Sequence, residues 1–164
     1  EVTFALATEM LLLSDAALTE ADARTRVVHA WNSGAAHQEF HAMLARQGGR
    51  WSASVERYAG CPVVDVVSEH AGWVADINAR DVAIAAMEAG AGRMREDDMI
   101  DHAAGVVILA PTGTKVELGM VVARAYASTQ SKAESLGAQL RTMIQTVTAP
   151  VEREPPRILD IWRD

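Results

Sequence analysis

Two histidines stand four residues apart near residue 40, a spacing that can chelate a metal ion. On a helix, His37 and His41 would share one face, as the two histidines of a zinc-binding HExxH motif do. Glu39 stands at the third position of that motif instead of the second, so its side chain would point to the opposite side. Zinc sites need three or four ligands, and no further Cys or His is close in sequence. We therefore interpret the pair as polar residues on a solvated face, with a zinc site as the weaker alternative.

A glycine-rich turn in the second half of the chain is a candidate phosphate site. Its residues, Gly90-Ala91-Gly92-Arg93, offer backbone N–H groups and one arginine. Phosphate loops, however, precede a helix and use the positive end of its dipole, whereas this turn follows a predicted helix. We predict that Gly90 ends that helix and that Arg93 pairs with a nearby acid, one of Glu96, Asp97, Asp98 and Asp101.

Acidic residues and a single cysteine are the remaining candidates for chemistry. The acidic run consists of Glu96, Asp97, Asp98 and Asp101, with His102 beside it. Its spacing lacks the alternating ligands of a calcium loop, which favours a solvated turn over a Mg²⁺ or Ca²⁺ site. Cys61 has no neighbouring His or Lys to activate its thiol, and no GxSxG elbow occurs. The residues thus predict no catalytic, cofactor-binding or metal-binding site in this chain.

Helices are predicted throughout the first 49 residues. The first helix, residues 1–14, carries apolar residues at three- and four-residue spacing, namely Val2, Leu6, Met10 and Leu13. Because it is apolar on its other sides as well, it is typical of a helix buried by neighbours. Further helices are predicted over 19–33, opened by a capping box at Thr19, and over 36–47. Three helices have too little mutual surface to cover the first, so we expect its packing partner to be another polypeptide or a missing segment.

The pattern changes to short β-branched runs at residue 63. Strands are predicted at 63–67, 72–77, 106–109, 116 and 121–126, with a closing strand at 158–162. Short helices are predicted over 82–89, capped by Asp81, and over 132–146. The resulting plan is an α+β chain with a helical segment 1–49, a connector 50–62 without helical periodicity, and a C-terminal α+β domain 63–164.

Composition and charge exclude several classes of protein. The chain has 164 residues, 49% hydrophobic and 23% charged, which is typical of a globular protein. A net charge of −7 argues against nucleic-acid binding. One cysteine permits no internal disulfide and predicts a reducing, cytoplasmic location. No apolar run is long enough for a membrane span, and no signal peptide is visible. Because the chain opens at Glu1 directly on an apolar helical pattern, we expect it to be part of a longer protein.

Two stretches of the β-rich domain resemble the halves of a barrel-sandwich hybrid, the fold of biotinyl and lipoyl carriers. They are Ser68–Val74 and Pro111–Val121. In those carriers a modified lysine stands at a hairpin tip between the halves. No lysine occurs here between Trp73 and Ala110, so the swinging-arm function is not expected, although a barrel-sandwich-like module is.

A more specific resemblance is to the C-terminal domain of thymidine phosphorylase and related pyrimidine-nucleoside phosphorylases. The motifs occur in family order: Ala71–Ala79, Gly90–Arg93, Ile100–Val106, and the spacing of Gly113, Val116 and Gly119. Leu6–Leu11 and Phe40–Gly49 are similar to the closing helices of that family's α/β domain. The resemblance covers about residues 2–127, and it makes the helical segment the end of a larger α/β domain.

The resemblance implies reversible phosphorolysis of thymidine or uridine to the free base and a (deoxy)ribose 1-phosphate. The family's phosphate-binding and pyrimidine-holding groups lie upstream, in a region absent from this chain, so no residue here inherits a catalytic role. The implied partners are that missing N-terminal portion and, for the whole homo-oligomeric enzyme, phosphate and a pyrimidine nucleoside. No cofactor is implied. The alternative is a standalone, non-catalytic binding module that uses the barrel-sandwich surface.

Overall fold

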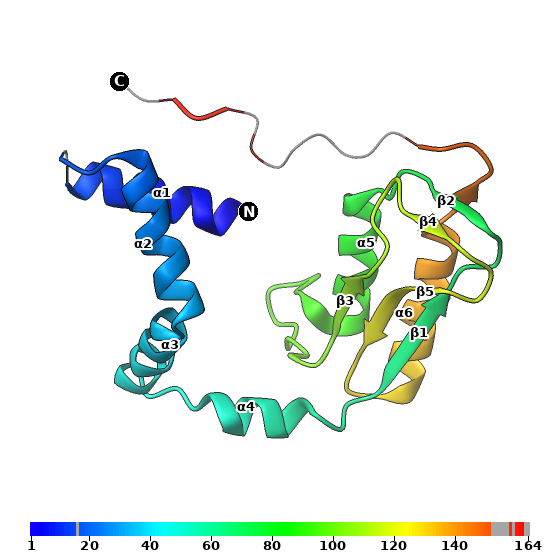
Figure 1. The fold of residues 1–164 in the computed structure, drawn as a ribbon. Coiled ribbons are helices and arrows are strands. Elements are labelled where there is room, and N and C mark those ends of the chain that lie inside the picture. Colours follow the sequence, from blue (N-terminus) through cyan, green and yellow to red (C-terminus); the bar gives the residue numbers. More distant parts are fainter. Residues whose placement is uncertain (16, 152–157, 159, 163–164) are drawn as a thin grey trace. The chain divides into compact units, whose positions relative to one another are not determined.

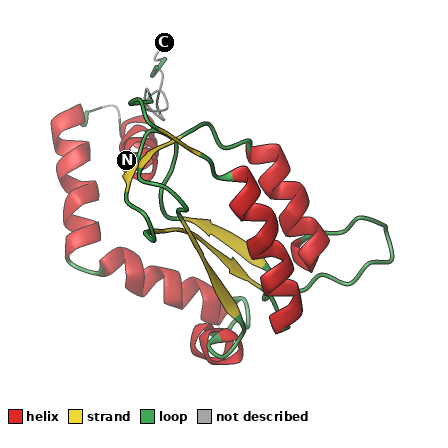
Figure 2. Ribbon diagram, turned by 90° about the vertical axis from the view of Figure 1, so that its right-hand side faces the viewer, coloured by secondary structure: helices red, strands yellow, loops and turns green. Residues whose placement is uncertain are grey.

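The structure, a computed structural model, divides the chain into two compact units (Figure 1). It describes residues 1–15, 17–151, 158 and 160–162. The first unit comprises residues 1–56 with the C-terminal stretch from 155, and the second comprises residues 57–154. In the described part of the chain every strand lies in the second unit, whereas the first is built from helices (Figure 2).

Three consecutive helices make up most of the first unit. They are α1 (Val2–Ser14), α2 (Glu20–Asn32) and α3 (Ala35–Arg46). The predicted cap of α2 is confirmed, because the Thr19 hydroxyl oxygen accepts a hydrogen bond from the Asp22 N–H at 3.2 Å. Helices α1 and α2 pack together, with the ring centroids of Phe4 and Trp31 5.3 Å apart.

The apolar stripe of α1, which was expected to need a packing partner from another polypeptide or a missing segment, is exposed in this chain. Leu6 is 61% exposed, Met10 70% and Leu13 87%, while the one buried residue of the helix is Thr8. The Thr8 hydroxyl donates to the Phe4 carbonyl at 2.8 Å and so needs no outside partner. The spacing identified an apolar side correctly, but it contained no information about which side α2 would cover.

A fourth helix, α4 (Trp51–Tyr58), occupies the segment predicted to be an irregular connector. That prediction was wrong. Trp51, Val55 and Tyr58 recur at helical spacing, which marks one side of a helix. The Trp51 ring meets the Phe40 ring edge to face at 5.6 Å, so this aromatic contact joins α4 to α3.

Two small antiparallel sheets form the second unit. The first has the order β1-β5-β3, from Val63–Val67, Val121–Tyr126 and Gly105–Ile108. The second has the order β4-β2-β6, from Lys115–Val116, Gly72–Val74 and Thr146–Val147. Asp65 lies opposite Arg124 in the first sheet, and Arg124 Nε donates to Asp65 Oδ1 at 2.9 Å.

Helix α6 (Gln130–Met143) covers the first sheet and supplies the centre of the core. Leu136 and Leu140 are buried there with Val66 and Val122 of β1 and β5. Gly137 lets the helix approach closely, because a Cβ at that position would lie 2.9 Å from Val64 Cγ1. Much of the remaining core is alanine, so the layers of this unit pack at short range.

Several predicted element ends were wrong in the second unit. Helix α5 (Ala79–Ala86) begins three residues before its predicted start, because Asn78 and not Asp81 caps it. Asn78 Oδ1 accepts from the Arg80 N–H at 3.0 Å and from the Asp81 N–H at 3.4 Å. A π-helical turn, η1 (Met87–Ala91), continues α5.

The C-terminal region also differs from its prediction. Helix α6 begins at Gln130 behind the cap Thr129 and ends at Met143, so Thr146 belongs to strand β6 and not to the helix. Of the predicted closing strand at 158–162, position 159 lies outside the described residues and the other four form no strand.

The predicted fold class is confirmed: N-terminal helices precede a mixed α+β unit of two small antiparallel sheets with short helices. Among the described residues, no helix combines the length and the apolar character that crossing a bilayer requires.

Candidate functional site

The two histidines of α3 lie side by side, as their spacing predicted. The Nε2 atoms of His37 and His41 are 3.1 Å apart, and the two rings meet edge to face. Glu39 does not join them, because its carboxylate forms an ion pair with Arg46. Within the described residues no group of three or more His, Cys, Asp or Glu side chains converges on a possible metal position.

The glycine-rich turn serves to bring two segments together. Gly90 has a φ of 114°, a conformation that side chains rarely adopt, and a Cβ there would lie 2.8 Å from Asp101 Cβ. The Gly90 carbonyl accepts a hydrogen bond from the Asp101 N–H at 2.8 Å. At Gly92 a Cβ would lie 2.8 Å from Met87 Cγ. The glycines therefore permit close packing, in agreement with their predicted structural role.

Asp101 fastens this turn to the start of α6. Its Oδ2 accepts from the Ser128 hydroxyl at 2.6 Å and from the Ser128 N–H at 3.2 Å, and its Oδ1 accepts from the Ala103 N–H at 3.0 Å. The Lys132 ammonium lies 3.9 Å away. Burial acts to raise the pKa of Asp101, but these hydrogen bonds and the lysine outweigh it and hold that pKa below its ordinary value. The carboxylate is thus a satisfied structural anion.

The predicted pairing of Arg93 with an acid is wrong. Arg93 is exposed and forms no ion pair with any described residue. Asp98 instead accepts from the backbone N–H groups of Met94 and Arg95, at 3.0 and 2.8 Å, and closes a local turn. These main-chain donors are fixed three and four residues away, whereas the flexible arginine would lose conformational freedom by pairing.

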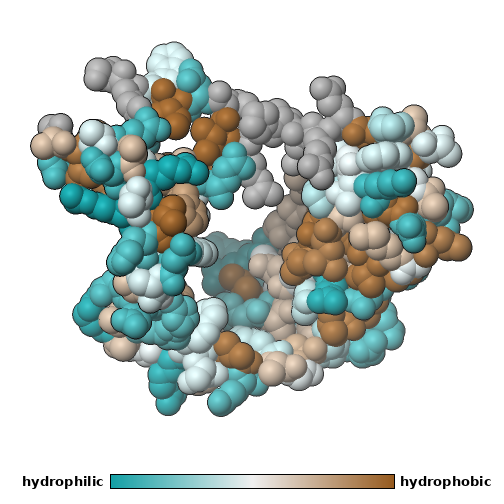
Figure 3. All heavy atoms as spheres, viewed as in Figure 1, coloured by the Kyte–Doolittle hydropathy of each residue, from teal (hydrophilic) through white to brown (hydrophobic). Residues whose placement is uncertain are grey.

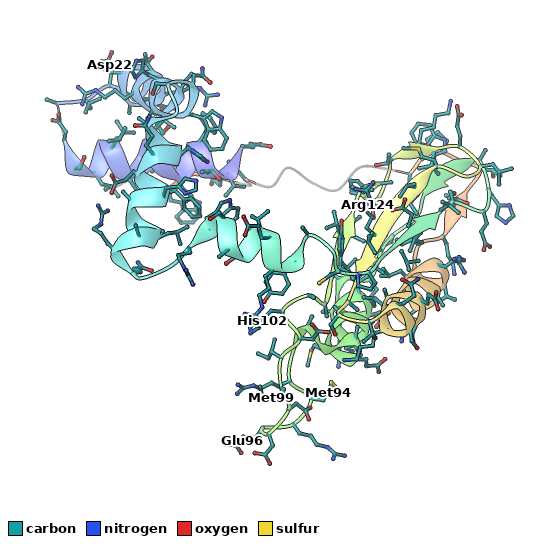
Figure 4. The ribbon with its side chains drawn as sticks, turned by 90° about the horizontal axis from the view of Figure 1, so that it is seen from below. Asp22, Met94, Glu96, Met99, His102 and Arg124 are labelled. Carbon is teal, nitrogen blue, oxygen red and sulfur yellow. The ribbon has the colours of Figure 1, made fainter. Side chains whose placement is uncertain are left out.

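The acidic loop projects from the second unit. Met94, Glu96 and Met99 point outward along it, with His102 near its base (Figure 4). Met99 is 89% exposed, and the carboxylates of the loop form no metal cluster with other described residues. The loop has the solvated character that the sequence predicted. Cys61 carries a free thiol and is half-buried. Its backbone N–H donates a hydrogen bond to the Tyr58 carbonyl at 3.1 Å.

One polar cavity was not foreseen from the sequence. It has a volume of about 500 Å³ and is lined by the segments 67–70 and 141–146. Arg141 and Glu69 both line it, with Arg141 Nε 3.8 Å from Glu69 Oε1, and the Ser68 hydroxyl donates to the His70 carbonyl at 2.7 Å. The two segments are some seventy positions apart, so no local motif could have indicated it. Because the cation and the carboxylate face each other, the cavity has no uncompensated charge for a ligand.

A second hollow, on the first unit, is almost wholly apolar. It has a volume of about 640 Å³ and lies along α1 and α2, with Phe4, Met10 and Trp31 among its lining residues. The Trp31 side chain is 59% exposed. Hydrophobic side chains also appear as separate patches over the second unit (Figure 3). The hollow is suited to cover by protein and offers few polar groups that would orient a small polar substrate.

The chain is similar in sequence to known phosphorylases. Residues 73–147 match the pyrimidine nucleoside phosphorylase C-terminal domain. A thymidine phosphorylase of Rhizobium meliloti is 35% identical over 162 residues, which are 96% of this chain and 36% of that protein. A pyrimidine-nucleoside phosphorylase of Bacillus subtilis is 29% identical over 163 residues, 97% of this chain and 36% of that protein.

The predicted resemblance is therefore confirmed, and it extends beyond the motifs that indicated it. A thymidine phosphorylase of Sinorhizobium medicae is 31% identical over 93% of this chain and likewise 36% of its own length. The chain spans about a third of the length of these relatives. Residues 73–147 are a pyrimidine nucleoside phosphorylase C-terminal domain, and the chain is homologous to the C-terminal region of thymidine and pyrimidine-nucleoside phosphorylases.

Proposed function

We propose that this chain is the scaffolding C-terminal part of a thymidine phosphorylase, which converts thymidine and phosphate reversibly into thymine and 2-deoxyribose 1-phosphate. The names of its relatives and the 36% coverage of their length support this assignment. The groups that bind phosphate and nucleoside would belong to polypeptide equivalent to the remaining two thirds. The assembled enzyme would be a cytoplasmic homo-oligomer.

The observation that carries the proposal is the uncovered apolar surface of the first unit. Leu6 and Leu13 of α1 are mostly exposed, and the apolar hollow runs along the same helix. Covering one such side chain stabilises a protein by about 1.5–3 kcal/mol, so this surface favours a large partner. Polypeptide equivalent to the part of the relatives that this chain does not span fits that need.

The residues of this chain would act on the reaction by position alone. In phosphorolysis a phosphate oxygen attacks the anomeric carbon, while positive charge develops on the sugar and negative charge on the departing base. Catalysis requires groups that stabilise both charges at the moment they form. Asp101 and the glycine turn are engaged with Ser128, Ala103 and each other, which supports a structural role for them.

A chimeric enzyme tests the proposal. In it, this chain replaces the homologous segment of the Rhizobium meliloti thymidine phosphorylase, and thymine release is measured in phosphate buffer. We expect the chimera to be active. Leu13→Asp in the chimera should reduce soluble, active enzyme at least tenfold, because it places a charge in the covered surface. Leu118→Asp is the matched control, since Leu118 is 72% exposed but lies in the second unit.

Two outcomes would contradict the proposal. One is a folded, soluble chimera that releases no thymine. The other is a Leu13→Asp chimera as active as the Leu118→Asp control, which would mean that the α1 surface stays uncovered in the enzyme. The first result would favour the alternative, a binding module that works without the phosphorylase, and the second would remove the observation on which the proposal rests.

A further inference from the structure

We propose that His37 and His41 form an open site for one divalent first-row transition metal ion on the exposed side of α3. Their Nε2 atoms lie 3.1 Å apart, and His37 is solvent-exposed. This inference does not depend on the proposed enzymatic function, because it concerns a different unit from the phosphorylase domain at 73–147.

The distance between the two nitrogens suits chelation. A Zn–N bond measures about 2.0–2.1 Å, so two imidazoles on one ion stand about 3.4 Å apart at a tetrahedral angle and about 2.9 Å apart at a right angle. The observed separation lies between these limits. Both ligand atoms can therefore bind one ion with only small rotations of the rings and no change in the backbone of α3.

The surroundings of His41 favour binding by holding its ring in place. The His41 ring meets the Phe40 ring edge to face at 5.7 Å and the Trp51 ring at 6.5 Å. A ligand fixed before binding loses less conformational freedom when the ion arrives. His37 contributes the second nitrogen from one turn earlier on the same helix.

Binding of the metal ion needs no other reactant, because it only moves one imidazole proton and displaces water from the ion. In the metal-free protein the Nε2 atoms are at hydrogen-bonding distance, so one imidazole donates its Nε2–H to the other. When the ion binds, that proton moves to Nδ1 of the same ring and two waters leave the ion. Both imidazoles are then neutral ligands through Nε2.

The remaining coordination positions would be filled by water. Glu39 is held by Arg46, and no third ligand converges here among the described residues. A two-nitrogen site of this kind suits Cu²⁺, Ni²⁺ and Zn²⁺ and does not suit Mg²⁺ or Ca²⁺, which prefer oxygen ligands. The site is therefore exchangeable, and its open positions can accept a further ligand from a partner.

The proposal can be tested by calorimetry. The full 164-residue chain is first freed of metal with a chelator and then titrated with Zn²⁺ and with Ni²⁺. We expect one ion per chain and at least a tenfold loss of affinity in His37→Ala, because only one nitrogen then remains. His29→Ala, which removes an exposed histidine of α2, is the matched control and should retain the affinity within about twofold. Mg²⁺ should give no binding at this site.

A second measurement separates ligation from folding. In nitrogen NMR spectra of the imidazoles, Zn²⁺ should shift the Nε2 signals of His37 and His41 together, in proportion to occupancy. His37 is exposed, so His37→Ala should leave the circular dichroism of the chain unchanged. The proposal is overturned if His37→Ala binds Zn²⁺ as tightly as the parent chain, or if the two Nε2 signals do not move together.

Discussion

Asp101 shows how a single acid can hold distant segments in register. Its carboxylate receives three hydrogen bonds, from Ser128 and Ala103, and its backbone N–H donates to the Gly90 carbonyl. It thereby connects the glycine turn, the loop after it and the start of α6. The same residues could be mistaken for a phosphate or metal site in sequence, because glycines and carboxylates serve close packing and ligand binding equally well.

Asp101→Asn should destabilise the second unit by about 1–3 kcal/mol, because an amide cannot accept all three hydrogen bonds. The check is a urea unfolding curve near neutral pH, with Asp97→Asn as control, since Asp97 is exposed in the same loop and makes none of these bonds. Equal unfolding midpoints for the two variants would contradict the assigned role of Asp101.

The stability contributed by Asp101 should also depend on pH. Its pKa in the folded protein lies below the ordinary 3.8, so the carboxylate stabilises the fold above that value. This contribution is lost as the pH falls through the lowered folded pKa. The parent chain should therefore lose more stability than Asp101→Asn between pH 5 and pH 2. Parallel losses in both proteins, measured by urea unfolding, would count against this prediction.

At the scale of elements, local signals predicted α1, α2 and α3 and most strands, because periodicity and caps act over a few residues. Two errors concern signals that were present but misread: the helical spacing of Trp51, Val55 and Tyr58 in α4, and the Asn78 cap of α5. Strand β6 is different. It has two residues, and its pairing with β2 joins segments far apart in sequence, so no local pattern could predict it.

The close approach of β2 and β6 gives a direct test of that pairing. A Cβ at Gly72 would lie 2.5 Å from the Val147 carbonyl oxygen, so Gly72→Ala should push the strands apart and cost about 1–3 kcal/mol. Gly105→Ala, at the start of β3, has open space around the added methyl group and is the control. Equal thermal unfolding temperatures for the two variants would contradict the close packing of β2 against β6.

In the candidate sites, too, contacts between residues close in sequence could be predicted, whereas contacts between distant segments could not. The proximity of His37 and His41 was predictable, because four residues make one helical turn. The polar cavity between the segments 67–70 and 141–146 was not, because it depends on how α6 packs on the sheet. That Arg93 has no ion pair with any described residue was not predictable either, since proximity in sequence does not fix a long exposed side chain.

At the scale of the whole molecule, the two units differ in how well each covers its own apolar residues. The second unit has a core of valine, leucine and alanine between α6 and the first sheet. The first leaves large side chains of α1 and α2 in water, including Leu13 and Trp31. Together with the coverage of a third of the relatives' length, this contrast is the basis for assigning the chain a scaffolding role.

The exposed α1 surface should make the isolated chain associate at high concentration. Replacing Leu6 and Leu13 by glutamine should reduce that association without lowering stability, because both side chains are mostly exposed already. Leu118→Gln in the second unit should have little effect. Light scattering after size exclusion measures the difference, and an unchanged association state in the double variant would disprove the link to α1.

The most direct test of the scaffolding role is an assay of the purified 164-residue chain alone, with thymidine in phosphate buffer, followed by thymine release. We expect no thymine above the rate of a buffer blank, because the groups that handle phosphate and nucleoside would lie in other polypeptide. Thymine release at an enzyme-like rate, tracking the chain through purification, would show instead that these residues contain a complete active site.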